Sequence, residues 1–283
     1  FARRAAPPHP SHVRMKQRVA SLGMYDHGPQ QAANDRLWNE IARILGARGI
    51  KGVPRHLDRS RTVQTLWHDP DLLFGQICGF PLISDPSLKL RVLATPVYDT
   101  PASGLGLHRS FLVARHDDAP TLPAYRGRAA AINGTDSNTG MNLFRAIVAP
   151  LADGGRFFGT VLHTGSHRES VAAIVRGDAD IAAIDSVTFA AVKRDSPEQI
   201  DALRILATTA ESATPPFVTS RTTPIEAVAA LRLALAQVVA DPGLAAARDA
   251  LFLRDIITGG TERYAPLRSL EIEAVVAGYP DFL

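Results

Sequence analysis

The hydrophobic and polar positions of this chain follow two different periods along most of its length. Short apolar runs typical of buried strands are separated by segments in which apolar residues recur at helical spacing. The clearest helix covers residues 33–48 and ends at Gly49, with its apolar face made by Leu37, Trp38, Ile41, Ile44 and Leu45. The alternation predicts an α/β protein with largely parallel sheets.

The same patterns predict the remaining elements. We expect strands at residues 18–24, 54–57, 88–95, 110–115, 128–133, 158–163, 181–185 and 203–209, and an apolar stretch at 72–80. Helices are expected at residues 63–68, 140–149, 166–176 and 186–193. Two Ala- and Leu-rich helices follow at residues 224–237 and 244–251. No strand is expected between these last two helices, and we expect them to pack back on the first part of the fold.

Two segments containing Gly or Pro, near residues 97–106 and 208–214, flank a central block of about a hundred residues, an ordinary domain size. This arrangement predicts a continuous second lobe, residues 101–207. The first lobe is then discontinuous and combines residues 17–100 with 208–283. Residues 1–16 are rich in Arg, His and Pro, so we expect a disordered extension there, and Met15 is either the original start or an internal methionine.

Composition and charge narrow the function. The chain is 46% hydrophobic and 21% charged, as expected for a globular protein with a sizeable core. Its formal net charge is +3 and its basic residues are scattered, so we do not expect a nucleic acid partner. The single cysteine, Cys78, excludes an internal disulfide. Residues 1–16 lack the apolar core of a secretory signal, which leaves both a periplasmic and a cytoplasmic location open.

The strongest local feature is a strand, a polar turn and a helix start at residues 129–144. Ser137, Asn138, Thr139 and Gly140 stand at the helix start, where unpaired backbone N–H groups and the helix dipole favour a bound oxyanion. The alternative is ordinary N-capping of the helix. Three consecutive small polar residues followed by Gly exceed what a cap needs, so a ligand site is favoured.

Two further junctions follow the same plan. At residues 161–170, His167 follows a Thr-Gly-Ser turn, and Ser166 with Glu169 is equally consistent with a capping box. The spacing of His163 and His167 does not favour a metal, because a Thr-Gly break separates them. At residues 177–186 an apolar strand ends in Asp185, which either contacts a ligand or caps the next helix.

Signatures of common enzymes are absent from the sequence. It has no GxSxG elbow, no phosphate-binding Walker loop and no HExxH motif, and Gly104-Leu105-Gly106 lacks the third glycine of a dinucleotide fingerprint. We therefore expect neither catalysis nor a cofactor.

Several segments together resemble the phosphate, phosphite and phosphonate binding proteins of ABC transporters. They are Gly23-Met24-Tyr25-Asp26, Tyr125-Arg126-Gly127-Arg128, residues 136–140, Phe157-Phe158-Gly159 with Thr164-Gly165-Ser166-His167, Gly177-Asp178-Ala179-Asp180, Ala183-Ile184-Asp185-Ser186 and Pro215-Pro216-Phe217-Val218. Their order and spacing match the family over most of the chain, from about residue 19 to residue 253.

The resemblance implies a type II periplasmic-binding-protein fold, with two lobes that are each a mixed sheet flanked by helices and are joined by two hinge crossovers. The family's oxyanion site maps to residues 137–140, and its Tyr, His and acid map to Tyr25, His167 and Asp185. In the first lobe, Gln76-Ile77-Cys78-Gly79 stands where phosphonate binders tend to have a hydroxyl-rich or aromatic segment. Gln76 joins the candidate ligand contacts.

Two classes of function follow from this resemblance. The first is a monomeric solute-binding component that closes on a small oxyanion and delivers it to an ABC permease. Phosphonate or phosphate is the expected ligand, with carboxylate and sulfonate left open. The second class is a cytosolic enzyme or sensor on the same fold, such as one that makes thiamine-pyrimidine precursors or reads an effector.

Overall fold

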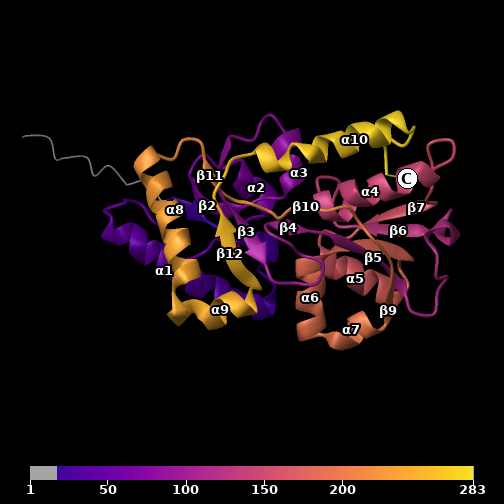
Figure 1. The fold of residues 1–283 in the computed structure, drawn as a ribbon, viewed down its shortest axis with the longest axis horizontal. Helices are drawn as coiled ribbons and strands as arrows, with labels where there is room; N and C mark the ends of the chain where they lie inside the picture. The colour runs from indigo at the N-terminus through magenta and orange to yellow at the C-terminus, as the bar shows by residue number, and fades with distance from the viewer. Residues whose placement is uncertain (1–17, 283) are drawn as a thin grey trace, which may run out of the picture.

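A computed structural model describes residues 18–282, which form two lobes side by side (Figure 1). The extension expected at residues 1–16 lies outside the described residues. Each lobe contains a five-stranded sheet covered by helices. The fold is therefore α/β, as the hydrophobic pattern predicts.

The sheet of the first lobe has the order β1-β2-β11-β3-β12. Its strands are β1 (Val19–Ala20), β2 (Leu72–Gln76), β11 (Phe217–Ser220), β3 (Leu90–Tyr98) and β12 (Leu253–Ile257). β1 and β2 pair in parallel, whereas β11 is antiparallel to β2 and β3, and β12 is antiparallel to β3. The helices of this lobe are α1 (Gln31–Ala47), α2 (Val63–Trp67), α3 (Gly79–Ser84), α8 (Ile225–Ala240) and α9 (Ala245–Ala250).

The sheet of the second lobe has the order β7-β6-β8-β5-β9. Its strands are β5 (Ser110–Arg115), β6 (Ala129–Ile132), β7 (Thr160–His163), β8 (Ile181–Asp185) and β9 (Leu203–Thr208). β6 pairs in parallel with β7 and β8, whereas β5 is antiparallel to β8 and β9. The helices are α4 (Leu143–Val148), α5 (His167–Arg176), α6 (Ser186–Asp195) and α7 (Pro197–Asp201).

The chain crosses between the lobes through two short strands that pair with each other. β4 (Leu107–His108) and β10 (Ser212–Ala213) form an antiparallel pair, in which Ser212 is opposite His108. Both crossovers thus run together at the junction of the lobes. The exact lobe boundaries at residues 100 and 208 stay a prediction.

The C-terminal segment contacts the second lobe, although the sequence assigned residues 208–283 to the first. After the turn η7 (Glu262–Tyr264), α10 (Pro266–Val276) runs across to α4 (Figure 1). The Asn142 amide donates to the Leu267 carbonyl at 3.1 Å, and Arg145 donates to the Pro280 carbonyl at 2.9 Å. The ring of Phe282 lies 4.8 Å from that of Phe144. A third segment therefore joins the two lobes.

The structure corrects three expectations about the elements. No strand forms at residues 54–57, where the Pro54 carbonyl instead accepts the indole N–H of Trp38. The stretch 72–80 divides into β2 and the start of α3. The sheets are mixed and not largely parallel, because β5, β11 and β12 run against their neighbours. The two Ala- and Leu-rich helices do pack on the first lobe, against α1.

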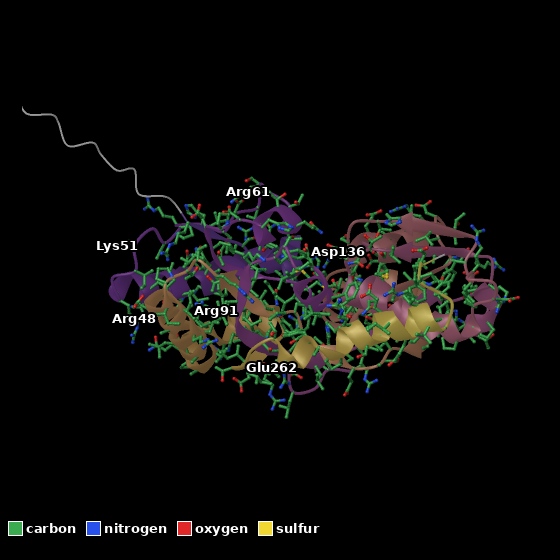
Figure 2. The ribbon with its side chains drawn as sticks, turned by 90° about the horizontal axis from the view of Figure 1, so that it is seen from above. Arg48, Lys51, Arg61, Arg91, Asp136 and Glu262 are labelled. Atoms are coloured by element: carbon green, nitrogen blue, oxygen red, sulfur yellow. The ribbon has the colours of Figure 1, made fainter. Side chains whose placement is uncertain are left out.

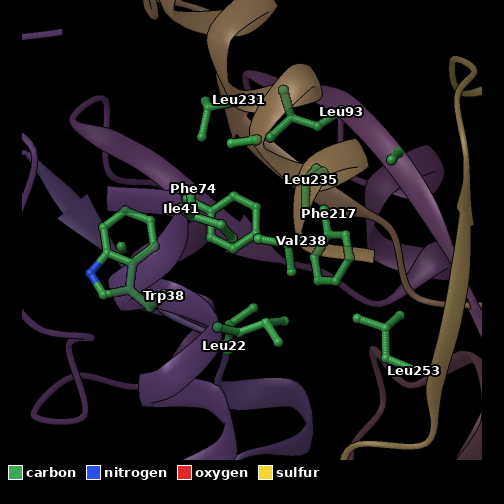
Figure 3. Packing of buried hydrophobic residues seen from close by; sticks show 14 of the residues in the cluster. Leu22, Trp38, Ile41, Phe74, Leu93, Phe217, Leu231, Leu235, Val238 and Leu253 are labelled. Carbon is green, nitrogen blue, oxygen red and sulfur yellow. The ribbon is translucent and has the colours of Figure 1, made fainter. Parts of the chain in front are cut away.

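One apolar cluster fills the space between α1, α8 and the first sheet (Figure 3). Trp38 is fully buried in it and stacks on Phe74 at 5.7 Å between ring centroids, and Phe74 stacks on Phe217 at 5.4 Å. Among the described residues, no single helix is long and apolar enough to span a membrane. The pair Ile225–Ala240 and Pro242–Ala250 meets that test only together, with a 77° bend.

Replacing Trp38 with Ala should lower the free energy of unfolding by about 3–5 kcal/mol, because it leaves a cavity and an unpaired Pro54 carbonyl. Urea unfolding with an unchanged m-value measures this loss. Ile225→Ala is the control, since Ile225 is 65% exposed; its effect should stay within about 0.5 kcal/mol. A loss below about 1 kcal/mol for Trp38→Ala would contradict the assigned core.

Candidate functional site

A cavity of about 200 Å³ lies where the lobes meet. The first lobe contributes Tyr25 and His27 from the segment around η1 (Gly23–Tyr25), and Cys78 from the start of α3. The second lobe contributes the helix start after β6, the start of α5 and the end of β8. His108 enters from the crossover β4. Segments distant in sequence thus converge on one small space.

The helix start after β6 is a π-helical turn, η4 (Asn138–Asn142), which continues into α4. Such turns recur at functional sites because they widen the helix locally. Ser137 caps it, since its Oγ accepts the N–H of Gly140 at 3.0 Å. The N–H of Asn138 points to Cys78 Sγ at 3.1 Å. The N–H of Thr139 has no acceptor among the described residues. The capping interpretation therefore holds for Ser137, while Thr139 keeps a free donor.

Gly140 stands behind the cavity wall and does not line the cavity. A Cβ at this position would overlap Asn133 Oδ1 and lie 2.9 Å from Cε1 of His167. The missing side chain therefore lets Asn133 and His167 approach the helix start. Gly140 therefore shapes the site, and its predicted contact with a ligand stays a prediction.

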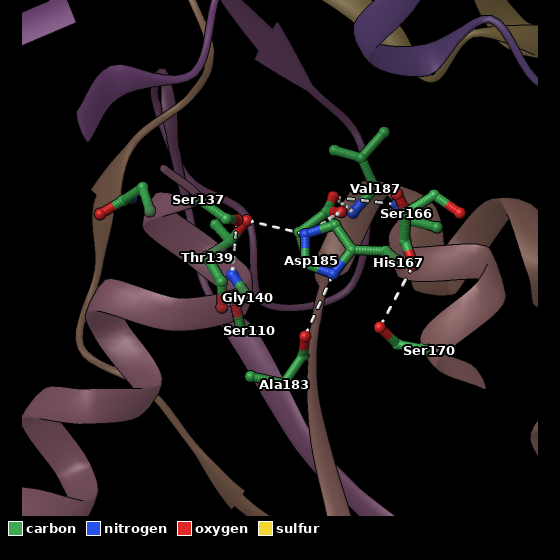
Figure 4. A network of polar contacts seen from close by, with 12 residues as sticks. Ser110, Ser137, Thr139, Gly140, Ser166, His167, Ser170, Ala183, Asp185 and Val187 are labelled. Carbon is green, nitrogen blue, oxygen red and sulfur yellow. Dashed lines mark hydrogen bonds and ion pairs between the residues drawn. The ribbon is translucent and has the colours of Figure 1, made fainter. Parts of the chain in front are cut away.

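His167 and Asp185 meet beside this helix start (Figure 4). His167 Nδ1 lies 3.1 Å from the Ala183 carbonyl, and Nε2 lies 2.9 Å from Thr139 Oγ1 and 3.3 Å from Asp185 Oδ2. Asp185 Oδ1 caps α6 by accepting the N–H groups of Val187 and Thr188, each at 3.0 Å. Asp185 therefore caps α6, one of the two roles that the sequence left open, and it also lines the cavity, while its contact with a ligand stays a prediction.

Burial and neighbouring charges shift the pKa values of these groups. Burial lowers the pKa of His167, and the charge of Asp185 opposes that shift. Burial would raise the pKa of Asp185, but the nearby His167 and His108 and the hydrogen bonds of Thr188 hold that pKa below its usual value. Burial, followed by the charge of Asp185, raises the pKa of Tyr25 well above its usual value. The tyrosine therefore enters the site as a neutral hydroxyl.

Among the cavity residues that were not predicted from the sequence, three carry a buried polar atom without a partner among the described residues. His27 Nε2, His108 Nδ1 and Asn133 Oδ1 are buried without a hydrogen-bond partner in the described part of the chain. Burial lowers the pKa of His27 and of His108 to about 4, so both rings are neutral near pH 7. Of these three, only His27 had a position that pointed to the site, because it lies two residues after the predicted site residue Tyr25. His108 lies between the predicted crossover at residues 97–106 and the predicted strand at 110–115, outside every segment that the pattern singled out.

The structure brings together most of the residues predicted for the site. The cavity is lined by Tyr25, Ser137, Asn138, Thr139, His167 and Asp185. Gln76 does not line it, because its amide donates to Tyr98 Oη at 2.8 Å and to the Pro215 carbonyl at 2.9 Å. This side chain instead ties β2 to the segment that follows the second crossover.

No Arg or Lys of the described residues lines the cavity. Figure 2 shows Arg48, Lys51 and Arg91 over the first lobe, away from Asp136 at the junction of the lobes. The described residues also contain no group of three or more His, Cys, Asp or Glu side chains arranged to hold a metal ion. The cavity thus offers neutral donors, neutral imidazoles and, among the described residues, three carboxylates, of which Asp185 is buried, Asp26 is paired with Arg59, and Asp136 is partly exposed.

A family model described as "ABC transporter, phosphonate, periplasmic substrate-binding protein" matches residues 78–266, which is most of the chain and includes most of the cavity. The chain belongs to this family. It is therefore a substrate-binding component of an ABC transporter, and the resemblance seen in the sequence is confirmed. A search of curated proteins finds no match.

Solved structures share the fold at low identity. A binding protein component of an ABC phosphonate transporter from Pseudomonas aeruginosa aligns with a TM-score of 0.74 at 15% identity, over 93% of this chain and 88% of that one. A Prochlorococcus marinus protein in complex with methylphosphonate aligns with a TM-score of 0.70 at 12% identity, over 91% and 97%. A Xanthomonas citri protein bound to ATP aligns with a TM-score of 0.68 at 16% identity, over 92% of this chain and 97% of that one. The type II periplasmic-binding-protein fold is thereby confirmed.

Buried, neutral His108 should make the free energy of unfolding depend on pH. The unfolded chain binds a proton near the ordinary pKa of 6.5, whereas the folded chain does so only at a pKa of about 4, so stability is lost as pH falls through that window. His108→Asn should reduce the loss between about pH 7.5 and about pH 4.5 by about 2 kcal/mol in urea unfolding.

His116→Asn is the control, because the side chain of His116 is 66% exposed. As the pH falls, the free energy of unfolding of this variant should decrease by the same amount as that of the unchanged protein. An equal loss in His108→Asn would show that His108 is not held neutral by burial.

Proposed function

We propose that the chain binds a small oxyanion of the phosphonate type in this cavity and delivers it to an ABC permease. The observation that carries the proposal is the helix start at η4, where Ser137 and Thr139 line the cavity and the N–H of Thr139 has no acceptor among the described residues. Ser137 Oγ uses a lone pair to cap the helix, so its proton stays available to a ligand oxygen. Helix starts of this kind bind anions without a cationic side chain.

The other walls suit the same ligand. Tyr25 offers a neutral hydroxyl, and His27 and His108 offer buried nitrogen atoms that have no partner in the described residues. Asp185 disfavours a second negative charge close to it and favours a ligand that carries a donor such as an amine. A phosphonate monoanion, whose P–OH group is a donor, and an aminophosphonate meet these requirements, and the Prochlorococcus marinus protein of the same fold was solved with methylphosphonate. Carboxylates and sulfonates are the competing ligands.

The role in the cell follows from the family. Its members are periplasmic, so we propose that this protein works outside the inner membrane, as a monomer and without a cofactor or a catalytic step. The family match favours this role over an enzyme or a cytosolic sensor on the same fold.

Ser137→Ala should weaken methylphosphonate binding roughly 10- to 100-fold in calorimetry, because a hydrogen bond to a charged oxygen contributes about 1.5–3 kcal/mol. It should also lower the stability of the unliganded protein by about 1 kcal/mol, since the cap is lost.

Thr62→Ala is the matched control, because Thr62 caps α2 through the N–H of Thr65 and does not line the cavity. This variant should lose a similar amount of stability and bind normally. Normal binding in Ser137→Ala would show that Ser137 only caps the helix.

Binding should also draw the lobes together, because groups from both lobes and from the crossovers line one cavity. Small-angle X-ray scattering should show a smaller radius of gyration at saturating methylphosphonate than without it. An unchanged radius with binding confirmed by calorimetry would count against hinge closure.

A further inference from the structure

His167 has a defined proton position in the unliganded protein. The Ala183 carbonyl only accepts, so the Nδ1 atom at 3.1 Å must carry a hydrogen. In the neutral ring Nε2 is then an acceptor, and it takes the hydroxyl proton of Thr139 at 2.9 Å. The Thr139 hydroxyl is therefore used within the protein and has no proton left for a ligand.

This arrangement leaves the neighbouring carboxylate unsatisfied. Asp185 Oδ2 is buried and has no hydrogen-bond partner of normal geometry among the described residues, although it lies 3.3 Å from His167 Nε2 and the Tyr25 hydroxyl is close enough to interact with the carboxylate. Two acceptor atoms, Nε2 and Oδ2, thus face each other without a proton between them, which is costly. One proton on Nε2 changes all three groups: Nε2 donates to Oδ2, the pair becomes an ion pair, and the Thr139 hydroxyl turns to donate into the cavity.

Binding of an anion in the cavity favours protonation of His167 at Nε2. No Arg or Lys of the described residues lines the cavity, and the charge nearest to His167 in the wall is that of Asp185. His27 and His108 face His167 from the first lobe and from β4, and Tyr25 faces Asp185. The cation beside His27 is Arg168, which is paired with Asp195 at 2.5 Å. An oxyanion therefore adds a negative charge beside a carboxylate with no lining cation to offset it.

We propose that the cavity takes up its oxyanion together with one proton, which His167 holds between Thr139 and Asp185. The inference rests on the proposed function and specifies the charge state that the site accepts. The proton comes from solvent when the ligand is a dianion, and from the ligand itself when it is a monoanion. Burial lowers the pKa of His167 before the ligand enters, so the ring is neutral near pH 7 and is able to accept that proton.

Proton uptake follows from linkage. Above the second pKa of the free ligand, binding should consume about one proton and affinity should fall about tenfold per pH unit. Below that pKa the monoanion brings its own proton, so net uptake should approach zero. A site that binds the dianion without a proton would show no uptake above the ligand's second pKa.

Isothermal titration calorimetry with methylphosphonate, in buffers of different ionisation enthalpy, counts these protons. One pH unit or more above the second pKa of methylphosphonate, the unchanged protein should take up about one proton per ligand. His167→Gln should bind more weakly, and both His167→Gln and Asp185→Asn should take up close to no proton. The Asp185→Asn variant should stay folded, because an asparagine side chain at this position still caps α6. His116→Gln, at an exposed position, should keep full uptake.

Nitrogen NMR of the unchanged protein locates the proton independently of any variant. Adding methylphosphonate at the same pH should move the Nε2 signal of His167 from the range of an unprotonated nitrogen to that of a protonated one. An unchanged Nε2 signal, binding without proton uptake, or full uptake in His167→Gln would each overturn the inference. Failure of the unchanged protein to bind methylphosphonate at any pH would overturn the proposed function instead.

Discussion

The burial of one carboxylate at the junction of the lobes governs the organisation of this site. Asp185 ends a fully buried strand, and an ionised group at such a place is stable only when its oxygen atoms have partners. The start of α6 supplies two N–H groups to Oδ1, and His167 approaches Oδ2. The second oxygen is left incomplete until a proton or a ligand arrives. Asp185 Oδ1 is therefore fully hydrogen-bonded within the protein, whereas Oδ2 still lacks a hydrogen-bond donor of normal geometry among the described residues.

The fold explains why these groups meet. β6 and β8 are parallel neighbours, so the loops at their carboxyl ends, which carry Ser137 and Asp185, emerge at the same edge of the sheet. The paired crossovers β4 and β10 bring His108 to that edge, and α10 spans both lobes beside it. Because the cavity wall includes segments of both lobes, a relative movement of the lobes changes the site itself.

Local patterns predicted the parts of the structure that depend on neighbours in sequence. Ser137, His167 and Asp185 were found because each follows a strand and begins a helix, and that junction has a physical signature. His108 carried no such signature, since only tertiary packing brings it to the cavity, whereas Asn133 lies in the strand-turn-helix segment at residues 129–144 but was not singled out. β11 is fully buried and only four residues long, so it shows no alternation to detect. Gln76 was assigned from its place in the chain, but its amide is used in two internal hydrogen bonds.

The central claim is that the helix start at η4, together with His167 and Asp185, encloses the ligand. A crystal structure of the complex with methylphosphonate tests it most directly. We expect the phosphonate oxygens to accept hydrogen bonds from the Thr139 N–H and the Ser137 hydroxyl, inside the cavity between the lobes. A phosphonate group bound elsewhere, or held by an Arg or Lys side chain away from η4, would contradict this account.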